Sequence, residues 1–458
     1  MRYISTRGQG EPLTFTETIL TGLARDGGLF IPETFPQVGD QLESWSRLNY
    51  RDLAFEIMSR YADDIPPAEL KAIIDRSYRV FRDPETTPVR PLGDLWLLEL
   101  FHGPTYAFKD IALQFLGNLF EYVLARDGRR MNIIAATSGD TGSAAIQGVR
   151  GRKGIEIFVM HPHGRVSPVQ ERQMTTVLDP NVHNLAVKGT FDDCQSIVKS
   201  LFGDLPFRDR NHLGAVNSIN WARVLAQVVY YFYAGLKVLR TTGAKRLRFT
   251  VPTGNFGDIF AGYVAAQMGL PVERLVAATN ENDILARYFQ GGTYSLGQVA
   301  PTLSPSMDIQ VASNFERYLY FLAQKNPSKL VQWMETFKAT GSLTPGVADD
   351  PILTGGRGDT ADTLQTIREA WESHQVLLDP HTAVGVAVAR RNLSPDAPMV
   401  TLATAHPAKF PDAIRQATGK DLAHIPELDA LAAKPVRCDL IEPSPQAVGG
   451  YLEATLSL

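Results

Sequence analysis

A lysine and a glycine-bearing loop are the features of this sequence whose residue types could do chemistry together. Lys109 lies near the end of the run Phe-His-Gly-Pro-Thr-Tyr-Ala-Phe-Lys-Asp at residues 101–110. A second run, Thr-Gly-Asn-Phe-Gly-Asp, follows at residues 253–258. A lysine amine can bind an aldehyde as a Schiff base, and a loop lined by main-chain N–H groups can bind a phosphate. The pair indicates pyridoxal phosphate, an electron sink that makes the carbon acids of amino acids accessible at neutral pH.

The flanks of the glycine loop would position it for an anion. The apolar run Leu247–Pro252 is expected as a strand, and Asp258–Met268 is expected as a helix. Gly254 and Gly257 would then lie in the turn at the helix N-terminus, where unpaired N–H groups and the helix dipole favour an anion. Taken alone, the loop could also be a tight turn without a ligand, and Lys109 a solvated surface residue.

A third run supports the interpretation that a ligand binds. Thr-Ser-Gly-Asp-Thr-Gly, at residues 137–142, follows the expected strand Asn132–Ala136 and precedes a helix that begins near Ser143. A second polar, glycine-bearing helix N-terminus can hold a substrate carboxylate by the same physics.

The elements that must position these runs alternate along the chain. Short apolar runs are each followed by a polar, glycine-bearing turn and then by a helical stretch. Such alternation predicts parallel strands joined by crossover helices, which is an α/β architecture. The expected strands are residues 132–137, 155–160, 182–187, 247–252, 275–279 and 399–404.

Three domains are expected from these patterns. Residues 1–95, with helical patterns at Tyr50–Tyr61 and Pro67–Phe81, form an N-terminal domain. Residues 131–224 form a small α/β domain, and residues 96–130 with 225–458 form a large α/β domain that binds the cofactor. Residues 280–358 are richer in Gly, Pro and Ser and lack the rhythm of strands, so an irregular or helical insertion is expected there. Its role cannot be read from the sequence.

Composition argues against several classes of partner. With 45 Lys and Arg against 49 Asp and Glu, the formal net charge is −4, which leaves no electrostatic footprint for nucleic acid or an anionic membrane. The segment Val224–Leu239 is apolar but is interrupted by Gln227 and Lys237, so a buried core helix is expected rather than a membrane span. The first residues lack the pattern of a signal peptide or presequence, and a cytoplasmic protein is expected.

Neither the cysteines nor the histidines predict a metal site. Cys194 and Cys438 lie far apart, without the spacing of a disulfide framework or a zinc site. His161 and His163 flank a proline, but the spacing places no third ligand beside them. No metal is expected.

At this point the sequence resembles a known family, the fold-type II (tryptophan synthase β-like) pyridoxal-phosphate enzymes, and within them the threonine synthase family. The resemblance extends over nearly the whole chain and implies two open α/β domains around a cofactor cleft, with an N-terminal domain. Many relatives have asparagine where Asp140 stands, although the bacterial and fungal threonine synthases accept aspartate. The motifs that carry the resemblance, in order, lie at residues 101–110, 137–142, 217–223, 254–258 and 404–410.

The resemblance implies that O-phospho-L-homoserine and water are converted to L-threonine and phosphate, the last step of threonine biosynthesis. Lys109 would bind the cofactor and move protons, and Thr404 would meet the pyridine nitrogen. Asp140 would lie beside the ring, although an ionised carboxylate cannot donate a hydrogen bond to the ring oxygen, so the partner of that oxygen stays open. The cofactor phosphate would be held by Gly254, Asn255, Phe256, Gly257 and Asp258, and the substrate carboxylate by Ser138, Gly139 and Thr141.

The leaving phosphate of such a substrate needs a cation that the cofactor does not use. Arg223, in a helix that begins near Asn220, fits this need because an arginine fork suits a phosphate. Asn217 and Ser218, in the preceding turn, can donate hydrogen bonds to it, and Lys409 is a further candidate. The alternative is that Arg223 makes a surface ion pair while Asn217 and Ser218 only cap the helix.

Two other functions stay open on the sequence. Another fold-type II lyase, such as a serine or threonine dehydratase, would share Lys109 and the glycine loop but would need no second phosphate site, so Arg223 discriminates between them. A non-catalytic ligand-binding paralogue is the other alternative. The sequence does not decide between a monomer and a homodimer, and it assigns no roles to His102, His381 and His406.

Overall fold

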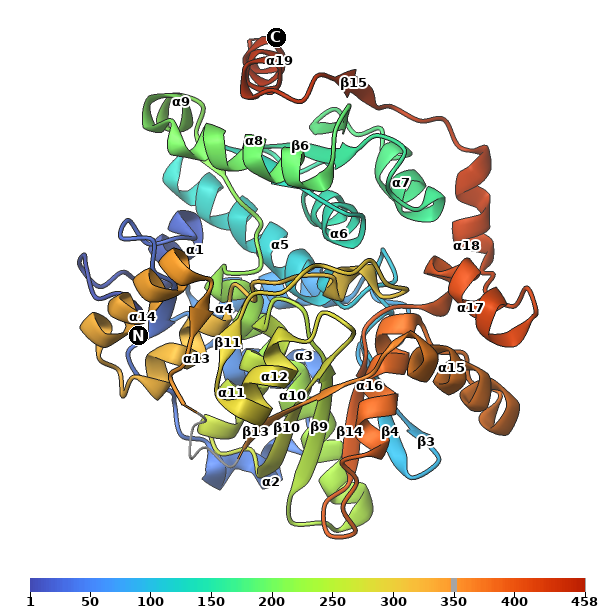
Figure 1. Cartoon of the computed structure of the whole chain (residues 1–458). Helices are drawn as coiled ribbons and strands as arrows, with labels where there is room; N and C mark the ends of the chain where they lie inside the picture. Colours follow the sequence, from blue (N-terminus) through green and yellow to red (C-terminus); the bar gives the residue numbers. More distant parts are fainter. Residues whose placement is uncertain (347–351, 458) are drawn as a thin grey trace. The chain divides into compact units, whose positions relative to one another are not determined.

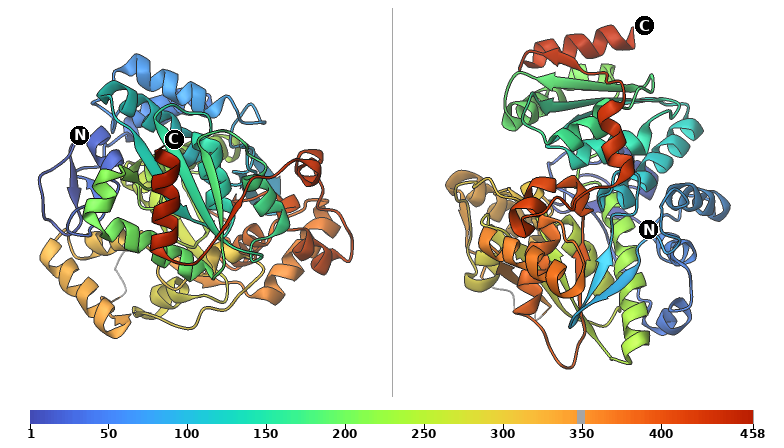
Figure 2. Two further views of the ribbon diagram at one scale, coloured as in Figure 1. Left: turned by 90° about the horizontal axis from the view of Figure 1, so that it is seen from above. Right: turned by 90° about the vertical axis from the view of Figure 1, so that its right-hand side faces the viewer.

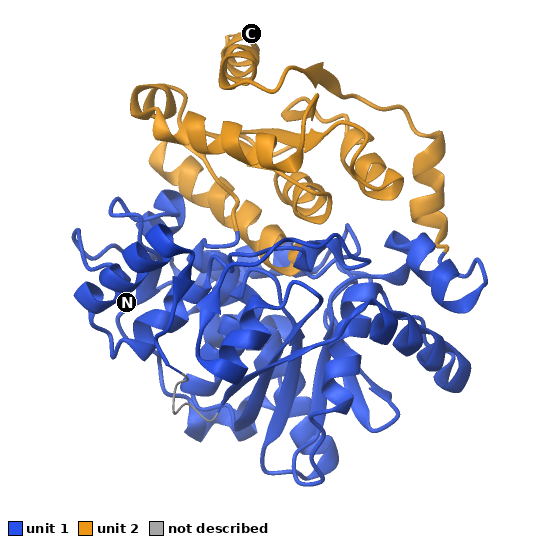
Figure 3. Cartoon of the chain, viewed as in Figure 1, with its two compact units in different colours: residues 1–108, 218–423 blue, residues 109–217, 424–458 orange. Residues whose placement is uncertain are grey.

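The computed structural model describes residues 1–346 and 352–457. Its contacts divide the chain into two units, residues 1–108 with 218–423 and residues 109–217 with 424–458 (Figure 3). Residues 1–95 are thus grouped with the larger unit, and residues 109–130 and 424–458, which the sequence placed in the large domain, belong to the smaller one. The difference arises because both segments pack on helices and strands of the smaller unit.

The first unit is built on a six-stranded sheet in the order β13-β10-β9-β14-β4-β3 (Figure 1). All neighbouring strands are parallel except β3 and β4, which are antiparallel. The α/β prediction is therefore confirmed. The strands are β3 (Val89–Leu92), β4 (Leu95–Glu99), β9 (Leu247–Pro252), β10 (Val272–Thr279), β13 (Leu353–Arg357) and β14 (Met399–Ala403).

Strand β13 corrects the expectation for residues 280–358, of which 347–351 lie outside the described residues. Leu353–Arg357 is an edge strand parallel to β10, although Gly355 and Gly356 give it little strand propensity. A Cβ atom on Gly355 would lie 2.9 Å from Ala286 Cα in helix α12 (Ile284–Gly291), and one on Gly356 would lie 2.7 Å from Val388 in helix α16 (Pro380–Arg390). The two glycines therefore allow helices α12 and α16 to approach the strand closely. Because glycine is rare in strands, the sequence of this segment does not predict one.

Helix α10 (Trp221–Thr242) is the longest element of this unit. It begins at the capping residue Asn220, ends at Gly243 with φ 71°, and buries most of its length, so the expected core helix is confirmed. Among the described residues, no helix has both the length and the apolar character needed to cross a bilayer. The other helices are α1 (Phe15–Thr21), α2 (Leu42–Trp45), α3 (Tyr50–Met58), α4 (Pro67–Tyr78), α11 (Gly257–Gln267), α13 (Phe315–Leu322), α14 (Pro327–Thr340), α15 (Thr360–His374) and α17 (Pro411–Thr418).

The second unit has a parallel sheet in the order β15-β7-β6-β5-β8. Its strands are β5 (Met131–Ala136), β6 (Ile155–Pro162), β7 (Val182–Val187), β8 (Leu213–Gly214) and β15 (Asp439–Ile441). Its helices are α5 (Lys109–Asp127), α6 (Asp140–Val149), α7 (Pro168–Thr175), α8 (Phe191–Gly203), α9 (Leu205–Arg210), α18 (Pro426–Asp429) and α19 (Pro445–Leu456).

Two contacts explain why residues 109–130 and 424–458 join this unit. Helix α5 packs closely on α6, because a Cβ atom on Gly117 would lie 2.0 Å from the carbonyl oxygen of Gly148. At the C-terminal end, β15 pairs with β7, and Val448 and Leu452 of α19 pack in the core of the unit. Figure 2 shows α19, in dark red, lying over the sheet of this unit. Such contacts between distant parts of the chain leave no local signal in a sequence.

Candidate active site

The loop between β9 and α11 has the geometry of an anion-binding turn. Phe256 adopts a left-handed conformation with φ 64°, and a Cβ atom on Gly254 would lie 2.7 Å from the carbonyl oxygen of Ser306. Within the described residues, the N–H groups of Thr253 and Phe260 donate hydrogen bonds, whereas none of those of residues 254–257 does so. The loop thus offers main-chain donors at the N-terminus of a helix, where a phosphate is favoured.

The Asp258 carboxyl is directed at helix α10. Its Oδ1 atom accepts hydrogen bonds from Tyr230 (2.5 Å) and Tyr231 (2.8 Å). Burial raises the pKa of Asp258 to about 6, while the two hydrogen bonds oppose the rise. The sequence analysis missed both tyrosines, although paired hydroxyls on an apolar helix signal a buried polar partner.

Asn314, in the segment expected to be an insertion, joins the glycine loop to the turn before α10. Its main-chain N–H donates to the Asn255 carbonyl at 3.0 Å, and its side-chain amide donates to the Asn255 carbonyl at 3.2 Å and to the Ser218 carbonyl at 3.1 Å. Asn314 is fully buried. The loop at residues 254–257 and the turn at residues 218–220 are therefore held together within one unit.

Arg223 lies in the first turn of α10, and only 4% of it is exposed. Burial lowers its pKa to about 10, so the guanidinium stays charged at neutral pH. The surface alternative is therefore wrong. The capping alternative is wrong as well, because Asn220 caps the helix by accepting from the N–H of Ala222 at 3.0 Å. Asn217 belongs to the second unit and Ser218 to the first.

Thr404 directly follows β14, and its main chain is fully bonded. Its N–H donates to Thr382 Oγ1 at 3.1 Å, and its carbonyl accepts from the N–H of Phe108 at 2.8 Å. Within the part of the chain that the structure describes, the Thr404 hydroxyl makes no hydrogen bond. A neutral hydroxyl is thus available next to the peptide that leads into Lys109.

Two further residues of the C-terminal motif, Lys409 and His406, contact the segment at residues 101–106. Lys409 is fully buried and donates from Nζ to the carbonyl of Thr105 at 2.8 Å. Burial lowers the pKa of His406 to about 4, so its ring is neutral at pH 7.

In the second unit, Lys109 is the first residue of α5 and Asp140 the first of α6. Lys109 Nζ lies 3.9 Å from Asp140 Oδ2, and Asp140 Oδ1 accepts from the side chain of Gln170 at 2.8 Å. Gln170 is a further residue that the sequence analysis missed. A Cβ atom on Gly139 would lie 2.5 Å from Gln170 Cδ, so the glycine admits this contact.

The loop at residues 137–142 folds around the hydroxyl of Thr137. That oxygen accepts from the N–H groups of Gly139 (2.9 Å) and Gly142 (2.8 Å). The side chain of Ser138 is exposed and that of Thr141 is half-buried. The loop is thus a fixed turn at the N-terminus of α6.

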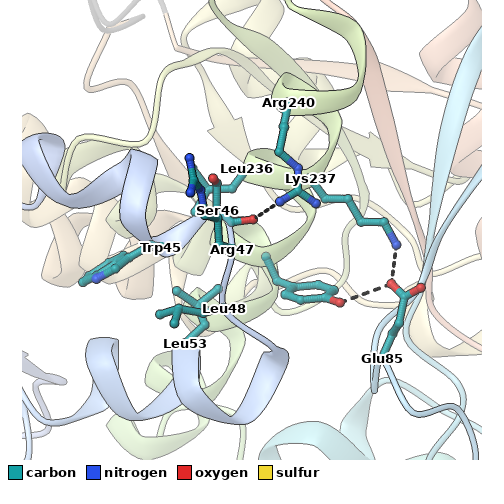
Figure 4. Close-up of a pocket in the computed structure, with 10 residues that line it drawn as sticks. Trp45, Ser46, Arg47, Leu48, Leu53, Glu85, Leu236, Lys237 and Arg240 are labelled. Atoms are coloured by element: carbon teal, nitrogen blue, oxygen red, sulfur yellow. Dashed lines mark hydrogen bonds and ion pairs between the residues drawn. The ribbon is translucent and has the colours of Figure 1, made fainter.

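A pocket elsewhere in the first unit contains none of these residues. Its volume is about 260 Å³, and Arg47, Lys237 and Arg240 lie around it (Figure 4). Glu85 forms an ion pair with Lys237, and Arg240 donates to the Ser46 carbonyl at 2.6 Å. These cations are therefore partly engaged by the protein itself.

Among the described residues, no group of three His, Cys, Asp or Glu side chains could hold a metal ion.

The residues fit pyridoxal phosphate, because an amine, a row of main-chain donors and a neutral hydroxyl are all present. The model of the family "Pyridoxal-phosphate dependent enzyme" matches residues 83–343. Two other models match, "Threonine synthase N terminus" at residues 2–78 and "Threonine synthase, C-terminal" at residues 382–451. The fold and the site thus define a fold-type II pyridoxal-phosphate enzyme.

Individual relatives narrow this class. The threonine synthase of Pseudomonas aeruginosa is 51% identical over 432 residues, covering 91% of this chain and 90% of that protein. The threonine synthase of Schizosaccharomyces pombe is 49% identical over 459 residues, covering 91% and 89%. The chain belongs to the threonine synthase family.

Solved structures agree with this assignment. The crystal structure of pyridoxal-phosphate-bound threonine synthase from Brucella melitensis has a TM-score of 0.95 and 44% identity, covering 99% of both chains. The threonine synthase from yeast has a TM-score of 0.93 and 45% identity, covering 100% of this chain and 99% of that one. The fold class and the cofactor expected from the sequence are confirmed.

Proposed function

We propose that the protein converts O-phospho-L-homoserine and water to L-threonine and phosphate, as the last step of threonine biosynthesis. One observation carries this proposal, the hydrogen bonds from Asn314 to Asn255 and to Ser218. They join the loop suited to the cofactor phosphate to the turn that leads into the buried, charged Arg223. A substrate with its own phosphate needs such a second anion site beside the first.

The cofactor would be held by groups with distinct tasks. Lys109 would bind its aldehyde, and the unbonded N–H groups of residues 254–257 would bind its phosphate. The Asp258 carboxyl, turned toward the tyrosines of α10, would support the loop from behind. The Thr404 hydroxyl would meet the pyridine nitrogen. When bound, the cofactor withdraws electrons from the substrate amino acid and makes its Cα–H and Cβ–H bonds acidic.

Proton movement would fall to Lys109. When not bound to the cofactor, its amine would accept protons from Cα and then from Cβ and return protons to Cγ and to Cα, while water supplies the hydroxyl at Cβ. Asp140 lies 3.9 Å from this amine and would stabilise its protonated form. Gln170, which donates to Asp140 Oδ1 at 2.8 Å, would hold this carboxyl group in place beside the amine.

The substrate would be held at both of its charged ends. The loop with Ser138, Gly139 and Thr141, at the N-terminus of α6, would bind the carboxylate. Arg223 would stabilise the negative charge that develops on the departing phosphate, with Asn217 and Ser218 as hydrogen-bond donors. Lys409 is a weaker candidate for this phosphate, since its amine already donates to the Thr105 carbonyl.

The proposal is tested by incubating the purified protein, loaded with pyridoxal phosphate, with O-phospho-L-homoserine. We expect phosphate and L-threonine in equal amounts. Phosphate together with 2-oxobutanoate would instead indicate elimination without hydration. Turnover of serine or threonine alone would indicate a dehydratase. A colour change without release of phosphate would indicate a non-catalytic ligand-binding paralogue.

A further inference from the structure

Asp379 is a fully buried carboxylate at the N-terminus of α16, in the first unit. It accepts hydrogen bonds from the Nδ1 atom of His381 (2.8 Å) and the main-chain N–H of His381 (3.0 Å). It also accepts from the hydroxyl and the main-chain N–H of Thr382. Four hydrogen bonds thus reach this carboxyl group, and each of the two donor residues leads on to a different part of the proposed cofactor site.

The first branch leads to Thr404. The Thr382 hydroxyl donates its proton to Asp379, so it can only accept from the N–H of Thr404, at 3.1 Å. The carbonyl of Thr404 in turn accepts from the N–H of Phe108 at 2.8 Å, and Lys109 is the next residue. Asp379 therefore fixes the direction of a chain of hydrogen bonds that ends at the peptide before the cofactor lysine.

The second branch leads to the phosphate loop. His381 Nε2 accepts from the N–H of Ser306 at 3.2 Å, so the Nδ1 atom carries the proton that is donated to Asp379. The carbonyl of Ser306 closes against Gly254, where a Cβ atom would approach it to 2.7 Å. His381 thus binds the segment around Ser306, and this segment packs against the loop proposed to bind the cofactor phosphate.

We propose that Asp379 is a positioning residue for the cofactor, holding Thr404 through Thr382 and the Gly254 loop through His381 and Ser306. This inference rests on the cofactor contacts given under the proposed function. One carboxylate would thus hold two cofactor contacts in place, at Gly254 and Thr404, which lie 150 positions apart in the sequence. Neither contact is made by Asp379 itself, so its role is seen in the state of the bound cofactor.

The two branches predict separable effects on the spectra of the bound cofactor, which are recorded without substrate, and on turnover. Asp379→Asn cannot accept from all four donors, and we expect its dissociation constant for pyridoxal phosphate to rise about 10-fold or more. His381→Phe should move the ³¹P resonance of the bound cofactor. Thr382→Val should shift the visible absorption band and lower kcat with little change in KM, while leaving the ³¹P resonance in place. Thr382→Ser, which keeps the hydroxyl, should restore the band and kcat.

A matched control removes a similar helix cap that does not lead to the site. Asp359 caps α15 by accepting from the N–H of Asp362 at 2.9 Å, and Asp359→Asn should leave cofactor affinity and both spectra unchanged. If Asp379→Asn does not fold, the comparison of Thr382→Val with Thr382→Ser still tests the branch from Asp379 to Thr404.

The inference is overturned if Thr382→Val and His381→Phe keep the wild-type spectra and cofactor affinity, or if Thr382→Ser and Thr382→Val behave alike. A wild-type protein that binds the cofactor but leaves O-phospho-L-homoserine intact contradicts the proposed reaction instead. Because these spectra need no substrate, the two failures are distinguishable.

Discussion

Lys109 Nζ lies 3.9 Å from Asp140 Oδ2, with side chains that are only 12% and 6% exposed. A carboxylate at this distance can form an ion pair with the amine when the amine is protonated. The amine must be neutral when it attacks an aldehyde and protonated when it has accepted a proton from carbon. Asp140 therefore sits where it can influence both states of the residue on which the reaction is proposed to depend.

Lys109→Ala should abolish turnover, because the same amine is proposed both to bind the aldehyde and to transfer protons. The phosphate loop should still retain some cofactor without a covalent bond. Borohydride reduction of the wild-type protein, followed by peptide mapping, should find the cofactor attached to Lys109. Attachment at any other lysine would refute the assignment.

Arg223→Ala should lower turnover of O-phospho-L-homoserine by about 10²-fold or more, as expected when a donor that stabilises developing charge is lost. The spectral change on adding serine, which has no phosphate, should be nearly unaffected. Arg223→Lys serves as the control, because it keeps the charge without the planar fork, and its loss should be smaller. Equal loss with both ligands would mean that the phosphate site lies elsewhere, with Lys409 the next residue to test.

Gly254→Ala should weaken the binding of pyridoxal phosphate by about 10-fold or more, because the added Cβ atom would lie 2.7 Å from the Ser306 carbonyl oxygen and displace the loop. Gly291→Ala is the matched control. Gly291 ends helix α12, and a Cβ atom there meets nothing within 4 Å. Titration of the cofactor-free proteins gives both affinities, and equal values for the two variants would argue against the loop.

The raised pKa of Asp258 should make the stability of the cofactor-free protein depend on pH. Burial raises its pKa from 3.8 to about 6, so the folded state binds the proton more tightly than the unfolded state. The resulting stabilisation is complete below pH 3.8 and is lost as the pH rises through about 6, a change on the order of 2–3 kcal/mol. Tyr230 and Tyr231 stay neutral throughout, because burial raises their pKa values.

Urea unfolding between pH 4 and pH 7 measures this change against Asp258→Asn, which cannot titrate. The free energy of unfolding of the wild-type protein should fall relative to that of the variant as the pH rises. Parallel curves for the two proteins would show that Asp258 titrates at its ordinary pKa.

Local patterns were sufficient for the elements that carry the site. The strands at Val182–Val187 and Leu247–Pro252 have the bounds expected from the sequence, because each is an apolar run closed by turn residues. Strand β13 was missed, since its two glycines serve the packing of helices rather than strand propensity. The C-terminal segment was assigned to the wrong unit because the pairing of β15 with β7 depends on residues about 250 positions apart.

The same distinction holds for the site. Lys109, Asp140 and the 254–258 loop stand in short motifs whose residue types indicate their chemistry. Asn314 and Asp379 support those motifs from distant parts of the chain, so no spacing reveals them. A partial signal exists for Asp379, since Asp-Pro at residues 379–380 is typical of a helix start, but the hydrogen bonds that give it a role come from tertiary packing.

In the proposed reaction, phosphate leaves by cleavage of its bond to carbon, and water is added to carbon. Turnover of O-phospho-L-homoserine by the loaded enzyme in ¹⁸O-labelled water shows where the solvent oxygen goes. We expect one labelled oxygen in the hydroxyl group of L-threonine and none in the released phosphate. Label in the phosphate, with homoserine as the other product, would mean hydrolysis at phosphorus and would rule out the proposed reaction.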